Sequence, residues 1–128
     1  MAFATLVPPA RSEEKPLDNA FLRDYAATRG FMLGRPSKAQ PTPDGRSILF
    51  LRAQPRVPRL SLYEFSVESG QTRELLAPEK VLAGAEEKLS PEEKARRERM
   101  RVSTGGFSDF QVAEDGELVL LSLAGKLY

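Results

Sequence analysis

The sequence contains no cysteine and no histidine. The absence of cysteine excludes disulfides, thiolate zinc sites and thiol nucleophiles. The absence of histidine excludes a Ser-His-Asp triad built within this chain, because the triad needs an imidazole to accept the proton of the nucleophile. It also removes the commonest ligand of transition metals. We therefore expect no catalytic residue, no metal site and no cofactor in this chain.

An excess of charge of one sign is also lacking. The 128 residues include 19 Lys and Arg and 18 Asp and Glu, which gives a net charge of +1. A chain so close to neutral has no overall attraction to nucleic acid. The arginines of residues 96–101 form a local basic run, but Glu98 interrupts it and no aromatic residue lies within it. We therefore disfavour nucleic-acid binding by this run.

Long hydrophobic runs are absent as well. No segment approaches the length that spans a membrane, so we expect no membrane partner. The N-terminal stretch has no basic start, and Pro8 and Pro9 interrupt its apolar residues, so it does not have the pattern of a signal peptide. The sequence as given fits a cytoplasmic protein. A periplasmic or secreted protein would have lost its signal sequence.

The N-terminal part of the chain divides into two segments. Residues 1–16 are rich in proline and charge and predict an extended or disordered arm. Residues 17–29 predict a helix, with Asp18 as N-cap and Gly30 as the C-terminal stop. One face of this helix carries Phe21, Leu22, Tyr25 and Ala26. The spacing indicates a short helix that docks through this apolar face.

The rest of the chain predicts mainly β structure. A loop over residues 34–45 ends in the turn Pro43-Asp44-Gly45. Strands are predicted over residues 47–53, 60–67, 72–76, 107–112 and 117–123, and a further strand begins at residues 127–128. The later turns contain glycine next to polar residues, at Gly70, Gly116 and Gly125.

Two parts of the chain repeat one order of features. The turns Pro43-Asp44-Gly45 and Glu114-Asp115-Gly116 each precede an apolar strand, and a Leu-Tyr pair follows, at Leu62-Tyr63 and at Leu127-Tyr128. This order is typical of four-stranded propeller blades. It predicts an incomplete β-propeller of about one and a half blades over residues 17–128, with one or two short helices and with the second blade cut at Tyr128. Two unrelated hairpins in a small β protein are the alternative.

A basic helix is predicted at residues 90–101, between the two repeats. Ser90 is the expected N-cap, Pro91 occupies the first helical position, and Glu93 completes a capping box. Pairs at i,i+4 join Glu92 to Arg96 and Glu93 to Arg97. Because the helix is polar on almost every side, a solvated surface helix whose charges only support these pairs is the alternative to a functional role.

These segments resemble a known family. Residues 43–52 (PDGRSILFLR), 62–65 (LYEF) and 69–76 (SGQTRELL) resemble the first propeller blade of bacterial dipeptidyl peptidase IV proteins. The most specific part is residues 89–101 (LSPEEKARRERMR), followed by residues 106–110 (GFSDF) and 125–128 (GKLY). The resemblance covers about residues 30–128.

The resemblance implies a serine exopeptidase that releases N-terminal dipeptides from peptide substrates. Such proteins join an N-terminal propeller to a C-terminal α/β-hydrolase domain that carries the triad, and they often form homodimers. This chain alone would then be inactive. Its implied role is substrate binding by an arginine beside the active site, with Arg101 as the first candidate and Arg97 and Arg99 as alternatives. A guanidinium suits this role because it is always charged and presents several donors.

A second function stays open at this point. A non-catalytic propeller module of the TolB-like kind would carry further blades but no hydrolase domain. The two functions differ in whether a Gly-x-Ser-x-Gly segment occurs further along the natural chain.

Overall fold

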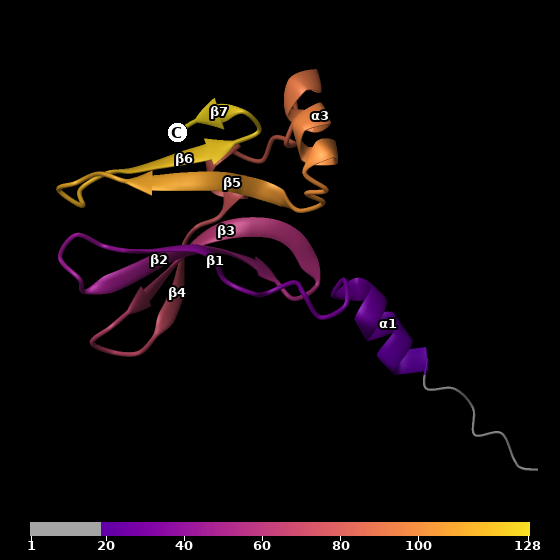
Figure 1. Cartoon of the computed structure of the whole chain (residues 1–128), viewed down its shortest axis with the longest axis horizontal. Helices are drawn as coiled ribbons and strands as arrows, with labels where there is room; N and C mark the ends of the chain where they lie inside the picture. The colour runs from indigo at the N-terminus through magenta and orange to yellow at the C-terminus, as the bar shows by residue number, and fades with distance from the viewer. Residues whose placement is uncertain (1–18) are drawn as a thin grey trace, which may run out of the picture.

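The computed structural model of the chain describes residues 19–128, so the predicted arm at residues 1–16 and the predicted cap at Asp18 lie outside the described residues. The described part is mainly β, with 39% strand and 20% helix, and its seven strands form one open sheet. Figure 1 shows two groups of strands, one above the other, with helices at their right-hand side.

The first group is an antiparallel meander of four strands in chain order. Its members are β1 (Ser37–Pro41), β2 (Ser47–Gln54), β3 (Val57–Ser66) and β4 (Thr72–Leu76). The predicted turn at Pro43-Asp44-Gly45 joins β1 to β2. There the Asp44 carboxylate accepts hydrogen bonds from the Thr42 hydroxyl at 2.6 Å and from the Arg46 N–H at 3.1 Å, and Gly45 has a φ of +68°. The turn chemistry read from the sequence is therefore confirmed.

Strand β1 corrects the prediction of an uninterrupted loop over residues 34–45. All five of its side chains are exposed, so its sequence carries no alternation of apolar and polar residues. It is held by backbone pairing to β2, and the register shifts between Ser37 and Gln40, where Lys38 has a φ of +53°. A proline and a bulge on an exposed edge strand are compatible with the sheet but invisible to a search for strand periodicity.

The second group consists of β5 (Gly105–Val112), β6 (Val119–Leu123) and β7 (Lys126–Leu127), all antiparallel. Beyond β7, the N–H and C=O of Tyr128 exchange hydrogen bonds with Leu121, both at 2.9 Å. The start of β5 runs parallel to β3 through the pairs Arg59 with Gly105 and Leu60 with Gly106, and this short contact joins the two groups.

The predicted sequence repeat falls on equivalent places of the two groups. Each Asp-Gly turn joins the first strand of its group to the second, and each Leu-Tyr pair falls on or next to the third strand. The core lies between the groups and consists of Leu49, Leu51, Leu62, Phe107, Phe110, Leu121 and Leu123. Burial of these side chains is the main stabilising contribution, at about 2 kcal/mol for each.

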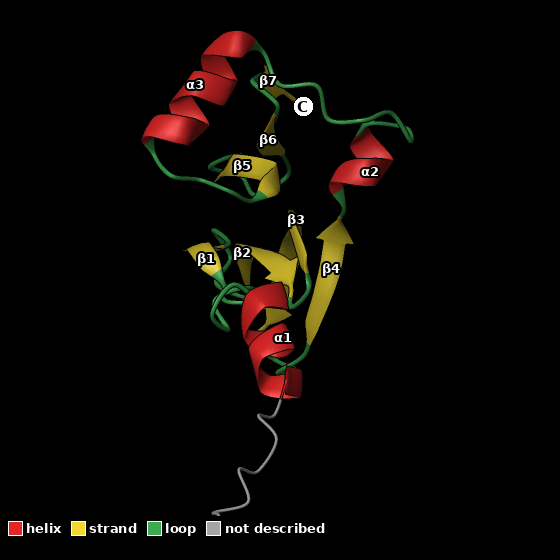
Figure 2. Cartoon of the chain, turned by 90° about the vertical axis from the view of Figure 1, so that its right-hand side faces the viewer, coloured by secondary structure: helices red, strands yellow, loops and turns green. Residues whose placement is uncertain are grey.

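Three helices flank the sheet, where one or two were expected: α1 (Asn19–Ala27), α2 (Pro78–Val81) and α3 (Pro91–Arg99) (Figure 2). Helix α1 ends at Ala27, earlier than the predicted residue 29, and the first left-handed residue after it is Arg29, with a φ of +52°, not Gly30. Gly30 follows with a φ of +71°, and its N–H donates to the Tyr25 carbonyl at 2.7 Å. The α1 residues Phe21 and Tyr25 form an aromatic cluster with Phe31, but all three remain more than half exposed. The apolar face expected to dock is thus not covered by the described residues.

Candidate functional site

The arginine-bearing helix α3 begins as predicted. The Ser90 hydroxyl accepts a hydrogen bond from the Glu93 N–H at 3.2 Å, and Pro91 occupies the first turn. The second half of the expected capping box is replaced, because the Glu93 carboxylate bonds arginines instead of reaching back to the cap. The helix also ends earlier than the predicted residue 101. Met100 is its C-cap, and Arg101 has a φ of +52°, which the helix cannot continue through.

A buried network of charges holds α3 against the sheet. Glu93 and Arg97 are only 7% and 9% exposed, although neither was predicted to be buried. The Arg97 Nε donates to Glu93 at 3.1 Å, and its second terminal nitrogen donates to the Glu87 carboxylate at 2.9 Å. The other oxygen of Glu87 accepts the Gly106 N–H at 2.9 Å. Charge-assisted hydrogen bonds, rather than an apolar face, therefore join α3, strand β5 and the linker between α2 and α3 (residues 82–90).

The Glu93 carboxylate is the centre of the acidic half of this network. Besides Arg97, it binds Arg96 through two hydrogen bonds of 2.8 and 2.9 Å. The predicted pair of Arg96 with Glu92 is therefore wrong, while the pair of Glu93 with Arg97 is confirmed. The hydrogen bonds from Arg96, and then those from Arg97, hold the pKa of Glu93 below its ordinary value. The same contact raises the pKa of Arg96.

The three candidate arginines lie in different environments. Arg97 is buried and paired on two sides, as described above. Arg99 and Arg101 are exposed, and neither side chain forms an ion pair or hydrogen bond with another of residues 19–128. Arg101 contributes only its backbone N–H, which donates to the Glu98 carbonyl at 3.1 Å. The structure therefore leaves Arg99 and Arg101 with all their side-chain donors available, and places Arg97 inside the protein.

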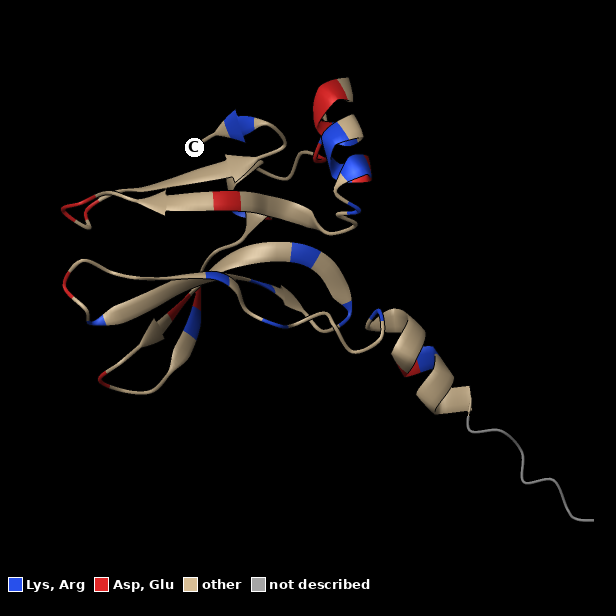
Figure 3. Ribbon diagram, in the orientation of Figure 1, with Lys and Arg blue, Asp and Glu red and all other residues tan. Residues whose placement is uncertain are grey.

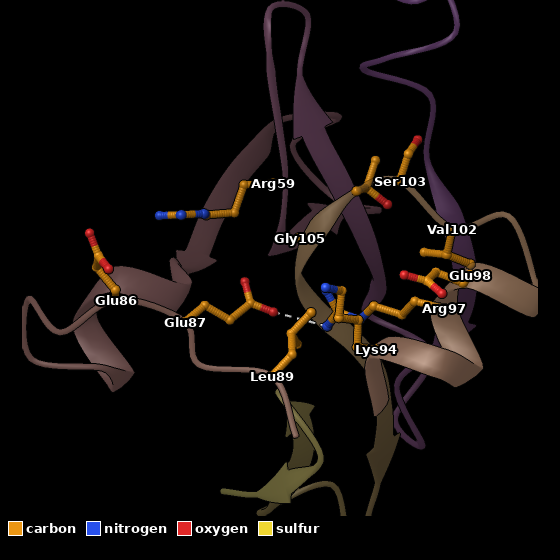
Figure 4. Close-up of a pocket in the computed structure, with 11 residues that line it drawn as sticks. Arg59, Glu86, Glu87, Leu89, Lys94, Arg97, Glu98, Val102, Ser103 and Gly105 are labelled. Carbon is orange, nitrogen blue, oxygen red and sulfur yellow. Dashed lines mark hydrogen bonds and ion pairs between the residues drawn. The ribbon is translucent and has the colours of Figure 1, made fainter. Parts of the chain in front are cut away.

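A cleft of about 500 Å³ opens beside α3 on the side of the linker (Figure 4). Its charged lining consists of Arg59, Lys94, Arg97, Glu86, Glu87 and Glu98. In Figure 4 the Glu87 carboxylate and the Arg97 guanidinium point toward one another across the cleft. Cations and acids are equal in number, so this cleft selects no ligand by charge. Neither Arg99 nor Arg101 lines it.

The loop after α3 is tied to a distant part of the chain. The Arg29 guanidinium, just after α1, donates a hydrogen bond to the Ser103 hydroxyl. Figure 3 shows basic and acidic residues together on α3, further basic residues on several strands, and several acidic residues in the turns at the other end of the sheet. The turn acids therefore do not neutralise the arginines of α3.

Within residues 19–128, no group of three or more Asp and Glu side chains is placed to hold a metal ion. None of the helices in that part of the chain is both long and apolar enough to cross a membrane. No model of a known protein family matches the chain.

Two residues of the charged network around α3 could not be predicted from the sequence. Glu87 lies ten positions before Arg97 in a linker with no regular pattern, and Gly106 lies nineteen positions after Glu87. Spacing rules along a helix reach three or four residues, so they found the pair of Glu93 with Arg97 and nothing beyond it.

Proposed function

We propose that this chain is the first part of the propeller of a dipeptidyl peptidase IV-like serine exopeptidase, and that it contributes substrate-positioning arginine but no triad. The triad would belong to a C-terminal α/β-hydrolase domain, and the substrate would be a peptide from which an N-terminal dipeptide is released. The chain alone would have no peptidase activity.

The observation that carries the proposal is the match between the sequence repeat and the strand order. Both groups place an Asp-Gly turn between their first and second strands and a Leu-Tyr pair at their third. Helix α3 lies between the two groups in sequence, where the family resemblance places an inserted basic segment. Four-stranded antiparallel meanders in succession are the repeating unit of a propeller, and the first group has that number and order of strands.

The outer face of the second strand group carries exposed leucines on which a further sheet could pack. Leu118, Leu120 and Leu127 are 71%, 43% and 65% exposed, respectively. Leu127 pairs with Ser122, which lies on the same face of the strand as Leu120. A sheet whose inner face is packed in the core and whose outer face also carries leucines is suited to lie between two neighbours.

The arginine role belongs to the exit of α3. Arg101 is the first choice and Arg99 the second, because their guanidinium groups keep all their donors for the carbonyl oxygens of a bound peptide. Arg97 is the weakest choice, since its donors already hold Glu93 and Glu87. Rather than touching the peptide, Arg97 is suited to fixing the helix that carries the other two.

The reading frame of the natural gene beyond Tyr128 tests the proposal. We expect further meanders, then a Gly-x-Ser-x-Gly segment with Asp and His after it. Further meanders without that segment would favour the non-catalytic TolB-like module, and a stop after Tyr128 would contradict both.

The isolated chain gives a second test. The purified 128-residue protein is expected to leave a Gly-Pro chromogenic substrate uncleaved, because it contains no imidazole to activate a serine. Turnover that copurifies with the chain through two independent columns would contradict the proposal.

A further inference from the structure

A second cleft lies on the other side of α3, between this helix and the start of β5. It has a volume of about 370 Å³, at the small end of ligand sites, which span roughly 300–1,000 Å³. We propose that this α3–β5 cleft binds a small organic anion, a carboxylate carried on a short apolar body. The proposal is independent of the peptidase assignment.

Apolar side chains line part of the cleft. Leu60, Met100, Val102 and Phe107 contribute to it from three different segments of the chain. Met100 and Val102 are 63% and 40% exposed, so they offer apolar surface to a ligand, while Phe107 is fully buried in the core. The polar residues Thr104, Ser108 and Ser122 also line the cleft. Apolar walls with a few polar groups between them are the usual composition of a small-molecule site.

The charged part of the cleft has an excess of donors. Its lining includes the cations Lys38, Arg96 and Arg97, but only the acids Glu93 and Asp109. The acids are already engaged: Glu93 accepts from both arginines, and one oxygen of Asp109 accepts from Lys38 at 3.0 Å. Arg97 is also paired with Glu87, so the donors that remain available to a ligand belong to Arg96 and Lys38.

Arg96 is the group best placed to bind the carboxylate. Its side chain is 50% exposed, and it uses Nε and one terminal nitrogen for Glu93. A guanidinium has five N–H donors, so the second terminal nitrogen remains available for an oxygen. Lys38, 49% exposed, spends one of its three donors on Asp109. Two cations at one cleft, each with donors to spare, favour an anion over a cation.

Nuclear magnetic resonance of the 128-residue chain tests the proposal, with 4-phenylbutyrate as the probe. We expect saturable shifts of the Gly106 and Ser108 amides with a dissociation constant of about 1 mM, the range of a small ligand with one charged contact. The amine 4-phenylbutylamine and the neutral 4-phenylbutanamide share the apolar body and should bind at least about tenfold more weakly.

Two variants locate the charged contact. Arg96→Gln should weaken 4-phenylbutyrate binding about tenfold, and its matched control Arg99→Gln should leave it unchanged, because Arg99 lies on the same helix but outside the cleft. Arg96→Gln leaves Glu93 its bond from Arg97. If the Arg96→Gln spectrum is nevertheless that of an unfolded chain, Lys38→Gln decides, with a weakening of about threefold expected.

Three results would overturn the proposal. These are shifts of the same size with the amine as with the carboxylate, binding unaffected by the deciding variant, and shifts confined to residues outside the cleft, such as the aromatic cluster of α1. None of these results bears on the reading frame beyond Tyr128, so failure here is separable from failure of the proposed function.

Discussion

Gly106 lies where the two strand groups meet, as the partner of Leu60. Its φ is +82°, and a Cβ at this position would lie 2.3 Å from the carbonyl oxygen and 2.7 Å from the nitrogen of Leu60. Backbone atoms in a sheet cannot retreat as a flexible side chain can. Only glycine therefore allows the parallel contact between β3 and β5.

Gly106→Ala is expected to lower the free energy of unfolding by about 3 kcal/mol or more, through a left-handed alanine and a backbone clash. Chemical denaturation measures it. Gly70→Ala is the matched control, because Gly70 has a φ of +66° but open space around it, and should cost about 1 kcal/mol. Equal losses in the two variants would show that the close contact with Leu60 does not exist.

Ionisation of Glu93 makes the free energy of unfolding depend on pH in the acidic range. Its pKa in the folded protein lies below the ordinary value of 4.5, because Arg96 and Arg97 stabilise the carboxylate. Its contribution is therefore complete above about pH 4.5 and is lost as the pH falls through the lower folded value. Glu93→Gln should lower the free energy of unfolding by about 2 kcal/mol at pH 7 and by less at pH 3. A loss of equal size at both pH values, measured by denaturation, would contradict the ionic role.

At the scale of elements, α3 is held by charge and not by apolar contacts. Its only buried residues are Glu93 and Arg97. The variant Glu87→Gln should weaken the bond from Arg97 and so loosen the helix on β5. Amide exchange in residues 93–99 should become about tenfold faster, which corresponds to a loss of about 1.4 kcal/mol in the free energy of local opening.

The neighbouring acid supplies a control for the α3 experiment. Glu86 lines the same cleft, is exposed, and forms no ion pair with another of residues 19–128, so Glu86→Gln should leave exchange in α3 unchanged. Faster exchange in both variants would assign the effect to general charge and not to the bond with Arg97.

Most strands could be predicted because their sequences carry local signals. Strand β2 contains the apolar run at residues 48–51, and the turn before it contains Gly45 at positive φ. The sequence analysis did not predict strand β1 or helix α2, for two different reasons. The side chains of β1 face solvent and show no period, while α2 is four residues long and begins at Pro78, where a strand was expected only to end.

The candidate site was predicted only in part. The helix, its cap and the pair of Glu93 with Arg97 follow from contacts within one or two turns. The burial of Arg97 depends on Glu87 and on the Gly106 N–H, which reach it through tertiary structure. Separating a buried arginine from an exposed one within residues 96–101 therefore required the fold, since all four arginines look alike in sequence.

At the scale of the whole molecule, a net charge of +1 conceals an uneven distribution. The exposed Arg99 and Arg101 lie at the end of α3, and several acidic residues lie in turns at the opposite end of the sheet (Figure 3). Over such a separation, exposed charges are screened at physiological ionic strength. The exit of α3 therefore acts as a locally basic site, as binding of peptide carbonyl oxygens would require.

The central claim is that the exit of α3 positions a peptide for a dipeptidyl peptidase. Its most direct test is the hydrolysis of Gly-Pro-p-nitroanilide by the full-length natural protein and by its Arg101→Ala variant, with Arg99→Ala beside it. We predict that Arg101→Ala lowers kcat/KM about 10- to 100-fold without changing Tm, the effect of losing one charged hydrogen bond. A full-length protein without turnover, or two variants with unaltered kcat/KM, would contradict the claim.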